Sequence, residues 1–229
     1  MLKTTVSFLS SIPNLSVVIG GDSTNNNTRS SKGDILEEWA SGDRQIETLA
    51  DDLYPLYKQD KILAIISGNH PNRVYNETFI RPEVMLACML GNRNLYKGSM
   101  LLAYINVRKN TYVHHIMHKG RKAQHAYDYI NADVNWIEHY HKPSFQEKVI
   151  VDHNKYTKKP IVKKCYDIFN GSFQMYPDYA KREGYRPYLP GFFIVEMGAK
   201  VGSGGGDTRD LKVWRDFDLA DMALRGYKL

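Results

Sequence analysis

Short apolar runs that stop at glycine or polar residues are the feature that most constrains the fold of this chain. Three of them span residues 16–19, 62–66 and 134–137. Runs of this length, bounded by Gly and polar residues, predict buried strands. Because helical patterns alternate with them, the sequence predicts an α/β fold with a mixed sheet.

Side chains that can bind metals follow each of these runs. The first run leads into Asp22, the second into Asn69 and His70, and the third into His139. In open α/β sheets, ligands bind just beyond the carboxyl ends of strands. We therefore expect these side chains to line one site.

The order of these groups resembles the calcineurin-like metallophosphoesterases of phages and bacteria, whose five sequence blocks are Asp-x-His, Gly-Asp, Gly-Asn-His-(Asp/Glu), a single His and Gly-His-x-His. The last four blocks match, within about residues 16–145, at Gly20-Gly21-Asp22, Gly68-Asn69-His70, His118 and His139-Tyr140-His141. Weaker similarity continues to about residue 197. The resemblance implies an α/β sandwich of two mixed sheets flanked by helices.

The resemblance also implies a role for each matched residue. The divalent metal ligands (for Mn, Fe, Zn or Ni) would be Asp22, Asn69, His118, His139 and His141, with Asp22 bridging two ions. His70 would be the general acid. Arg73 would contact the substrate or support the site, with a solvated loop arginine as the alternative. The implied reaction is hydrolysis of a phosphomonoester or phosphodiester through metal-activated hydroxide.

Several histidines compete for the single-His block. We prefer His118 because it ends a predicted strand at 111–117 and precedes Lys119-Gly120, which resembles the family's His-Gly turn. The others are interpreted as core or surface residues: His114, His115, His125 and His153.

Three departures from the family pattern affect these expectations. No Asp or His precedes Asp22, so the Asp-x-His block, with the first strand of the family fold, is absent. Pro71 replaces the acid after Gly-Asn-His, and Glu138 replaces the Gly before His-x-His. Either the chain is incomplete at its N-terminus, which we favour, or it is a natural variant with one metal or none. The sequence therefore does not decide whether the chain binds one metal ion or two.

Two other functions remain open. One is a DNA nuclease of the same fold, and the other is a hydrolytically impaired scaffold that binds a polyanion. Of the net charge of +6, residues 142–164 carry seven lysines against Glu147 and Asp152. Such a patch suits nucleic acid, whereas lysines on the edge of a sheet can also prevent strands of different molecules from pairing.

The rest of the chain predicts one domain, with a core at 14–197 and a β-rich extension at 198–229. We expect helices up to about Pro13 and at 43–57, 82–91 and 119–130, a loop around Pro71, and a turn near 176–183. Further strands are expected at 99–107, 145–152, 160–169, 191–197 and 211–216, and 202–207 reads as a Gly-rich loop.

Two cysteines make no disulfide framework, and Cys88 is expected to be buried and reduced. With no apolar stretch long enough to span a membrane, we expect a cytoplasmic protein.

Overall fold

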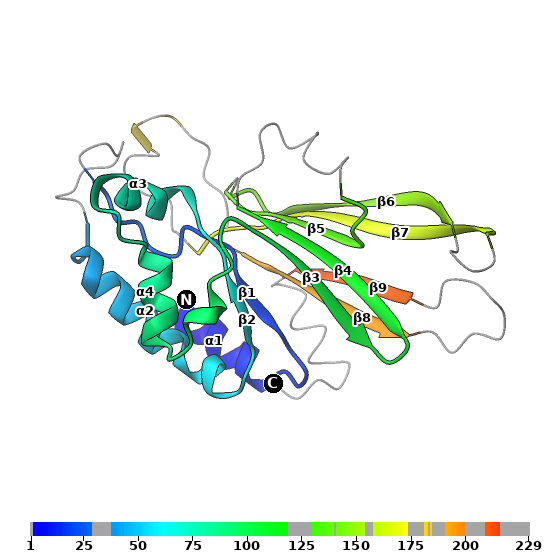
Figure 1. Cartoon of the computed structure of the whole chain (residues 1–229), viewed down its shortest axis with the longest axis horizontal. Helices are drawn as coiled ribbons and strands as arrows, with labels where there is room; N and C mark the ends of the chain where they lie inside the picture. Colours follow the sequence, from blue (N-terminus) through cyan, green and yellow to red (C-terminus); the bar gives the residue numbers. More distant parts are fainter. Residues whose placement is uncertain are drawn as a thin grey trace.

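The computed structural model describes residues 2–28, 38–118, 130–139, 141–153, 158–173, 181, 182, 184, 191–199 and 209–215. It is a mixed α/β protein with helices gathered on one side and a broad sheet on the other (Figure 1). The helices are α1 (Leu2–Ser11), α2 (Gly42–Lys58), α3 (Asn69–Thr78) and α4 (Pro82–Met89), with a 3-10 turn, η2 (Arg93–Leu95). None of the described helices is long and apolar enough to cross a membrane.

The described strands fall within one or two residues of the predicted ones. They are β1 (Val17–Ile19), β2 (Ile62–Ile65), β3 (Met100–Val107), β4 (Asn110–Met117), β5 (Val134–Ile137), β6 (Ser144–His153), β7 (Pro160–Phe169), β8 (Phe193–Ala199) and β9 (Arg209–Arg215). The predicted helix at 119–130, the turn at 176–183 and the Gly-rich loop at 202–207 lie almost wholly outside the described residues.

Parallel pairing brings the carboxyl ends of the site-bearing strands to common edges. β1 and β2 form a parallel pair, and a five-stranded sheet has the order β3-β4-β5-β7-β6. Within that sheet β4, β5 and β7 are mutually parallel, whereas β3 and β6 run antiparallel to their neighbours. The ends of β1 and β2 therefore meet, as do the ends of β4 and β5.

Besides a smaller cluster of Ile12, Ile194 and Trp214, two apolar clusters hold the layers together. One packs α1, α2 and α4 around β2 through residues such as Leu53, Leu56 and Ile65. The other places the β8–β9 ribbon on one face of the five-stranded sheet through Val134, Ile168 and Phe193. Because β9 pairs with β8, the described part of the predicted C-terminal extension joins the core.

Two local predictions were wrong. Residues around Pro71 were expected to form a loop, but they belong to α3. Pro71 is tolerated in the first turn because the backbone N–H that proline lacks has no helical partner there. Cys88 is exposed rather than buried, because α4 buries the opposite face, which carries Glu83, Leu86 and Ala87.

Several polar side chains are buried in the sheet, among them Lys163, Asp133 and His114. Lys163 and Asp133 form an ion pair at 2.8 Å, and their side chains are 5% and 1% exposed. The Asp133 carboxylate also accepts a hydrogen bond from the backbone N–H of Val113. His114 Nδ1 accepts a hydrogen bond from Trp136 Nε1 at 3.1 Å. Burial lowers the pKa of His114 to about 4, although the nearby Asp133 carboxylate acts in the opposite direction.

The low pKa of His114 predicts a loss of stability in acid. Between pH 6.5, the ordinary pKa of an exposed histidine, and pH 4 the unfolded chain binds a proton that the folded chain rejects, so stability falls as pH falls through this window. The full effect is roughly 3 kcal/mol. Denaturant unfolding at pH 7 and pH 4.5 should show a smaller loss for His114→Asn, which keeps an acceptor for Trp136. The exposed His153→Asn is the control, and an unchanged loss in His114→Asn would contradict the prediction.

Candidate metal centre

Asp22 lies where the ends of β1 and β2 come into close contact. A Cβ added to Gly68 would lie 2.1 Å from the Asp22 backbone nitrogen, and one added to Gly20 would lie 2.4 Å from Cδ of Glu138. Gly21 has a φ of +92°, which glycine adopts readily. Glycines at these positions therefore let three separate segments approach one point.

Three of the predicted ligands have left-handed backbone conformations. The φ angles of Asp22, His139 and His141 are 46°, 75° and 54°. A positive φ is uncommon for residues other than glycine and costs on the order of 1–3 kcal/mol. Such conformations concentrate at functional sites, where the surrounding structure enforces them.

His118, at the end of β4, is held by oxygen atoms on both sides of its ring. Its Nε2 lies 3.0 Å from Asp22 Oδ2 and 3.0 Å from Asn69 Oδ1. Its Nδ1 lies 2.9 Å from the carbonyl oxygen of Gly20. When Nδ1–H donates to that carbonyl, the lone pair of Nε2 faces Asp22 and Asn69. This is how proteins commonly orient a metal-binding histidine.

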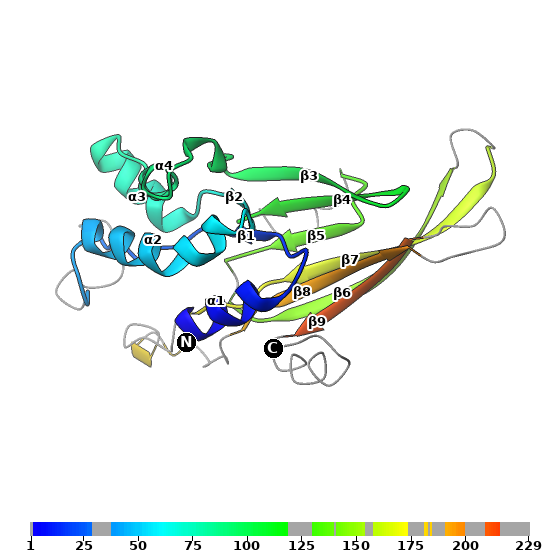
Figure 2. The same ribbon diagram turned by 90° about the horizontal axis from the view of Figure 1, so that it is seen from below.

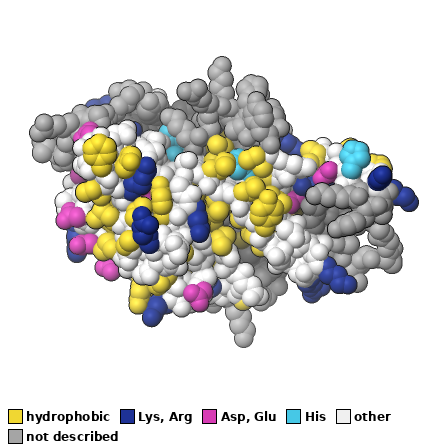
Figure 3. Space-filling view, in the orientation of Figure 1, with side chains coloured by type: hydrophobic (Ala, Val, Ile, Leu, Met, Phe, Trp, Pro, Cys, Tyr) yellow, Lys and Arg dark blue, Asp and Glu magenta, His cyan; other side chains and the backbone are white. Residues whose placement is uncertain are grey.

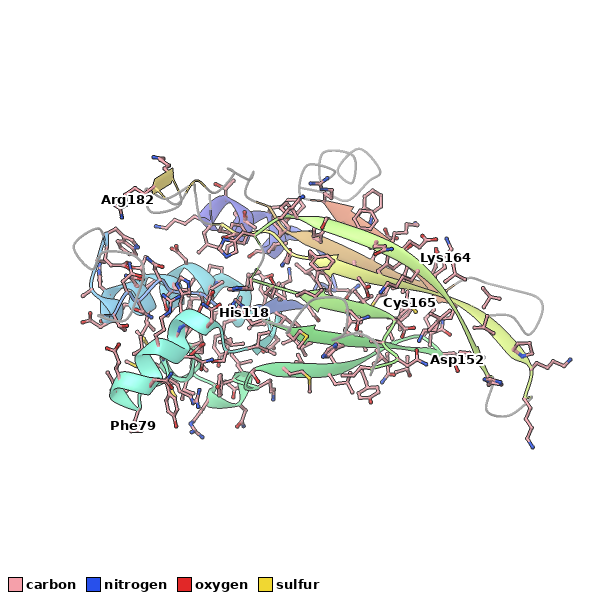
Figure 4. The ribbon with its side chains drawn as sticks, turned by 90° about the horizontal axis from the view of Figure 1, so that it is seen from above. Phe79, His118, Asp152, Lys164, Cys165 and Arg182 are labelled. Atoms are coloured by element: carbon pink, nitrogen blue, oxygen red, sulfur yellow. The ribbon has the colours of Figure 1, made fainter. Side chains whose placement is uncertain are left out.

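His139, just beyond β5, completes the group. Its ring meets that of His118 edge-on, with centroids 5.4 Å apart. Asp22, His118 and His139 each offer a ligand atom, and these atoms all lie within 4.8 Å of one another. Figure 4 shows His118 where the strands meet the helical side of the molecule. The triad is a candidate metal-binding group.

The chemistry of these donors fits a divalent transition metal. One carboxylate and two imidazoles converge, with the amide oxygen of Asn69 beside them. Mixed nitrogen and oxygen donors suit Mn²⁺, Fe²⁺, Zn²⁺ or Ni²⁺, whereas Ca²⁺ and Mg²⁺ prefer oxygen alone.

His70 borders the triad at the first turn of α3. Its backbone N–H donates to Asp22 Oδ1 at 2.7 Å, and its Nε2 lies 3.8 Å from Asp22 Oδ2. On the other side of the ring, Nδ1 contacts the side-chain and backbone oxygens of Asn25 at 3.0 and 3.2 Å. Burial lowers the pKa of His70, and the positive charge of Arg73 acts in the same direction, so Arg73 lies near the site.

The charges of Asp22 and His118 stabilise each other. Burial alone would raise the pKa of Asp22, but the hydrogen bond and charge of His118, with a smaller effect of His70, lower it to about 2. Burial alone would lower the pKa of His118, yet its contacts with Asp22 raise it. Asp22 is therefore an anion at neutral pH, held where a cation would also be stabilised.

The other two groups suggested by the sequence lie close by but outside the triad. His141 is near enough for the charges of Asp22, His70 and His118 to influence its pKa, which burial lowers. Burial raises the pKa of Glu138 to about 8, and its Oε1 accepts a hydrogen bond from Asn170 at 3.4 Å. Tyr140 lies outside the described residues.

Two supporting residues were missed by the sequence analysis. Asn25 holds His70, but it lies in a polar segment without periodicity. Glu83, only 1% exposed, accepts hydrogen bonds from Ser67 Oγ at 2.9 Å and from the Gly68 N–H at 3.0 Å. Glutamate is common in the first turn of helices, so only the tertiary contact reveals its role.

The geometry predicts that Asn69→Ala and His139→Ala each weaken metal binding. Loss of a direct ligand should exceed the roughly 10–100-fold loss that follows removal of a supporting partner. Calorimetric titration of the purified chain with Mn²⁺ or Zn²⁺ measures the change. His153→Ala, at the exposed end of β6, is the matched control. Unchanged affinity in both ligand variants would refute the assignment.

Comparisons with known proteins yield no significant match. Neither a protein-family model, nor a curated protein, nor a solved structure matches the chain. Function is therefore inferred from the side chains gathered at the strand ends.

Proposed function

We propose that the protein is a metal-dependent phosphoesterase that hydrolyses a phosphomonoester or phosphodiester. The observation that carries this proposal is the convergence of Asp22, His118 and His139, with Asn69 beside them, at the ends of separate strands. The order of these residues along the chain, which resembles the calcineurin-like metallophosphoesterases, supports it further. The finer architecture of that family, a sandwich of two mixed sheets, is part of the same proposal.

Four residues would hold one metal ion: Asp22, Asn69, His118 and His139. A bound divalent cation would stabilise negative charge on the phosphoryl oxygens and lower the pKa of a water molecule. Gly20 fixes the orientation of His118 through its carbonyl group. His141 is available near this group, but the described residues bring together one candidate metal-binding group, which supports a single ion.

The remaining side chains would bind and orient the phosphate ester. His70, held at Nδ1 by Asn25, presents its Nε2 toward Asp22. From there the doubly protonated ring would donate its Nε2 proton to the leaving oxygen as the general acid. Arg73, which follows on α3, would bind a phosphate oxygen, because guanidinium groups match the geometry of phosphates.

The lysine-rich segment gives only limited support to the nuclease alternative. Three of its lysines are ion-paired within the chain, Lys148 with Asp167, Lys163 with Asp133 and Lys164 with Glu147. Paired lysines contribute less to phosphate binding than solvated ones. DNA binding that weakens steeply with added salt would restore this alternative.

A second candidate function follows from the one candidate group of ligands among the described residues. One ion held by these residues could serve binding alone, in a scaffold that does not turn over a phosphate ester. Hydrolysis of bis(p-nitrophenyl) phosphate with Mn²⁺, and its loss with a chelator, separates the phosphoesterase from this scaffold.

We predict one metal ion per chain. Elemental analysis after Mn²⁺ loading and desalting measures the ratio, and His139→Ala should abolish it. Two ions per chain would contradict the single-ion site and bring His141 into a second one. No bound ion in the wild type would refute the metal centre.

We also predict that His70→Ala retains the metal but loses turnover. Removal of a general acid typically lowers the rate about 10²–10⁴-fold, whereas the backbone N–H of residue 70 can still donate to Asp22. Metal content and turnover are measured on the same preparation, with His153→Ala as control. Turnover equal to that of the wild type would refute the acid role.

A further inference from the structure

The β6 strand forms an open edge of the five-stranded sheet. It is 10 residues long, and among the described strands its one neighbour is β7. The β6–β7 ribbon extends away from the helical side of the molecule (Figures 1 and 2). Such an edge presents backbone N–H and C=O groups that can pair with another strand.

Exposed apolar side chains lie at the centre of this edge, between charged residues. Val149 and Val151 share one face of β6 and are 60% and 68% exposed, and Val162 beside them on β7 is 65% exposed. Basic side chains and a histidine gather at the far end of the ribbon (Figure 3). The Lys148 amine forms an ion pair with Asp167 of its own sheet, rather than standing as an isolated charge on the edge.

The sequence of β6 is complementary to itself when read antiparallel. Around Ile150, the order from residue 147 to 153 is acidic, basic, three apolar residues, acidic and basic. Two such strands with their Ile150 residues opposed would place Lys148 opposite Asp152, Glu147 opposite His153 and Val149 opposite Val151. Opposite charges and apolar residues that face each other across strands stabilise pairing.

We propose that β6 pairs antiparallel with β6 of a second copy of this chain, about a two-fold axis at Ile150. The contact is isologous, so each complementary pair occurs twice. It joins the two five-stranded sheets into one continuous sheet by strand addition. The partner is a second copy because the charge pattern of the edge matches itself.

The pattern also selects one register. A shift of two residues, which keeps the same faces together, places either Lys148 or Asp152 opposite Ile150. In either shifted register, a charged side chain faces the aliphatic Ile150 and no longer has a partner of opposite charge. Glu147 and Lys148 bond within their own chain as well, but their side chains remain 42% and 39% exposed and can face the second copy.

The proposed contact is separate from the candidate metal centre. Figure 4 shows Asp152 and Lys164 along the ribbon, away from His118. Association through β6 therefore leaves the metal ligands in place, and its presence or absence does not depend on the phosphoesterase proposal.

Paired charge variants test both the edge and its register. In Val149→Glu/Val151→Glu, each new carboxylate faces another across the axis, whereas in Val149→Glu/Val151→Lys it faces an amine. Sedimentation equilibrium over a range of concentrations measures dimerisation, and thermal unfolding verifies that both variants fold. Val162→Glu, on the same face but on β7, is the control for a general effect of surface charge.

We expect the wild type and Val162→Glu to dimerise alike. The doubly acidic variant should dimerise on the order of tenfold more weakly or worse, and the variant with opposite charges should recover most of this loss. A wild type that stays monomeric at its highest soluble concentration would overturn the proposal. So would equal dimerisation of both double variants, or a loss in Val162→Glu as large as in the doubly acidic variant.

Discussion

The close approach of strand ends at Asp22 is the constraint on which the rest of the site depends. Gly68 lies against the Asp22 backbone, and Gly20 lies against the buried Glu138. Because protein interiors are close-packed, added side-chain atoms at these points would force the strands apart. The parallel pair β1–β2 and the five-stranded sheet contact each other here, so the site is a product of how these two sheets meet.

Burial of a carboxylate at this junction has an electrostatic cost that the surrounding groups offset. Asp22 accepts a hydrogen bond from the backbone N–H of His70, and its carboxylate faces Nε2 of His118. These partners lower the pKa of Asp22 despite its burial. A buried anion is stable only when it is paired and hydrogen-bonded. His118, which stabilises Asp22, also belongs with it to the candidate metal-binding group.

The structure separates two regions with different chemistry. The buried His118, the partly buried His139 and the Asp22 carboxylate converge at the ends of β4, β5 and β1. Solvent-exposed valines and alternating charges line the β6–β7 ribbon. Three of the seven lysines in residues 142–164 pair with acidic residues, namely Lys148 with Asp167, Lys163 with Asp133 and Lys164 with Glu147. Part of the local excess of positive charge along the sequence is therefore neutralised within the chain.

The sequence by itself determined the strands and the order of the polar residues after them, because alternating and apolar runs encode local burial. It also singled out Asp22, Asn69, His118 and His139, which follow those runs. Only the tertiary structure decided that Pro71 lies in a helix, that Asn25 holds His70, and that Glu83 supports the Gly68 turn. These contacts join residues 15–45 positions apart, and local sequence patterns carry no information about which distant side chains will meet.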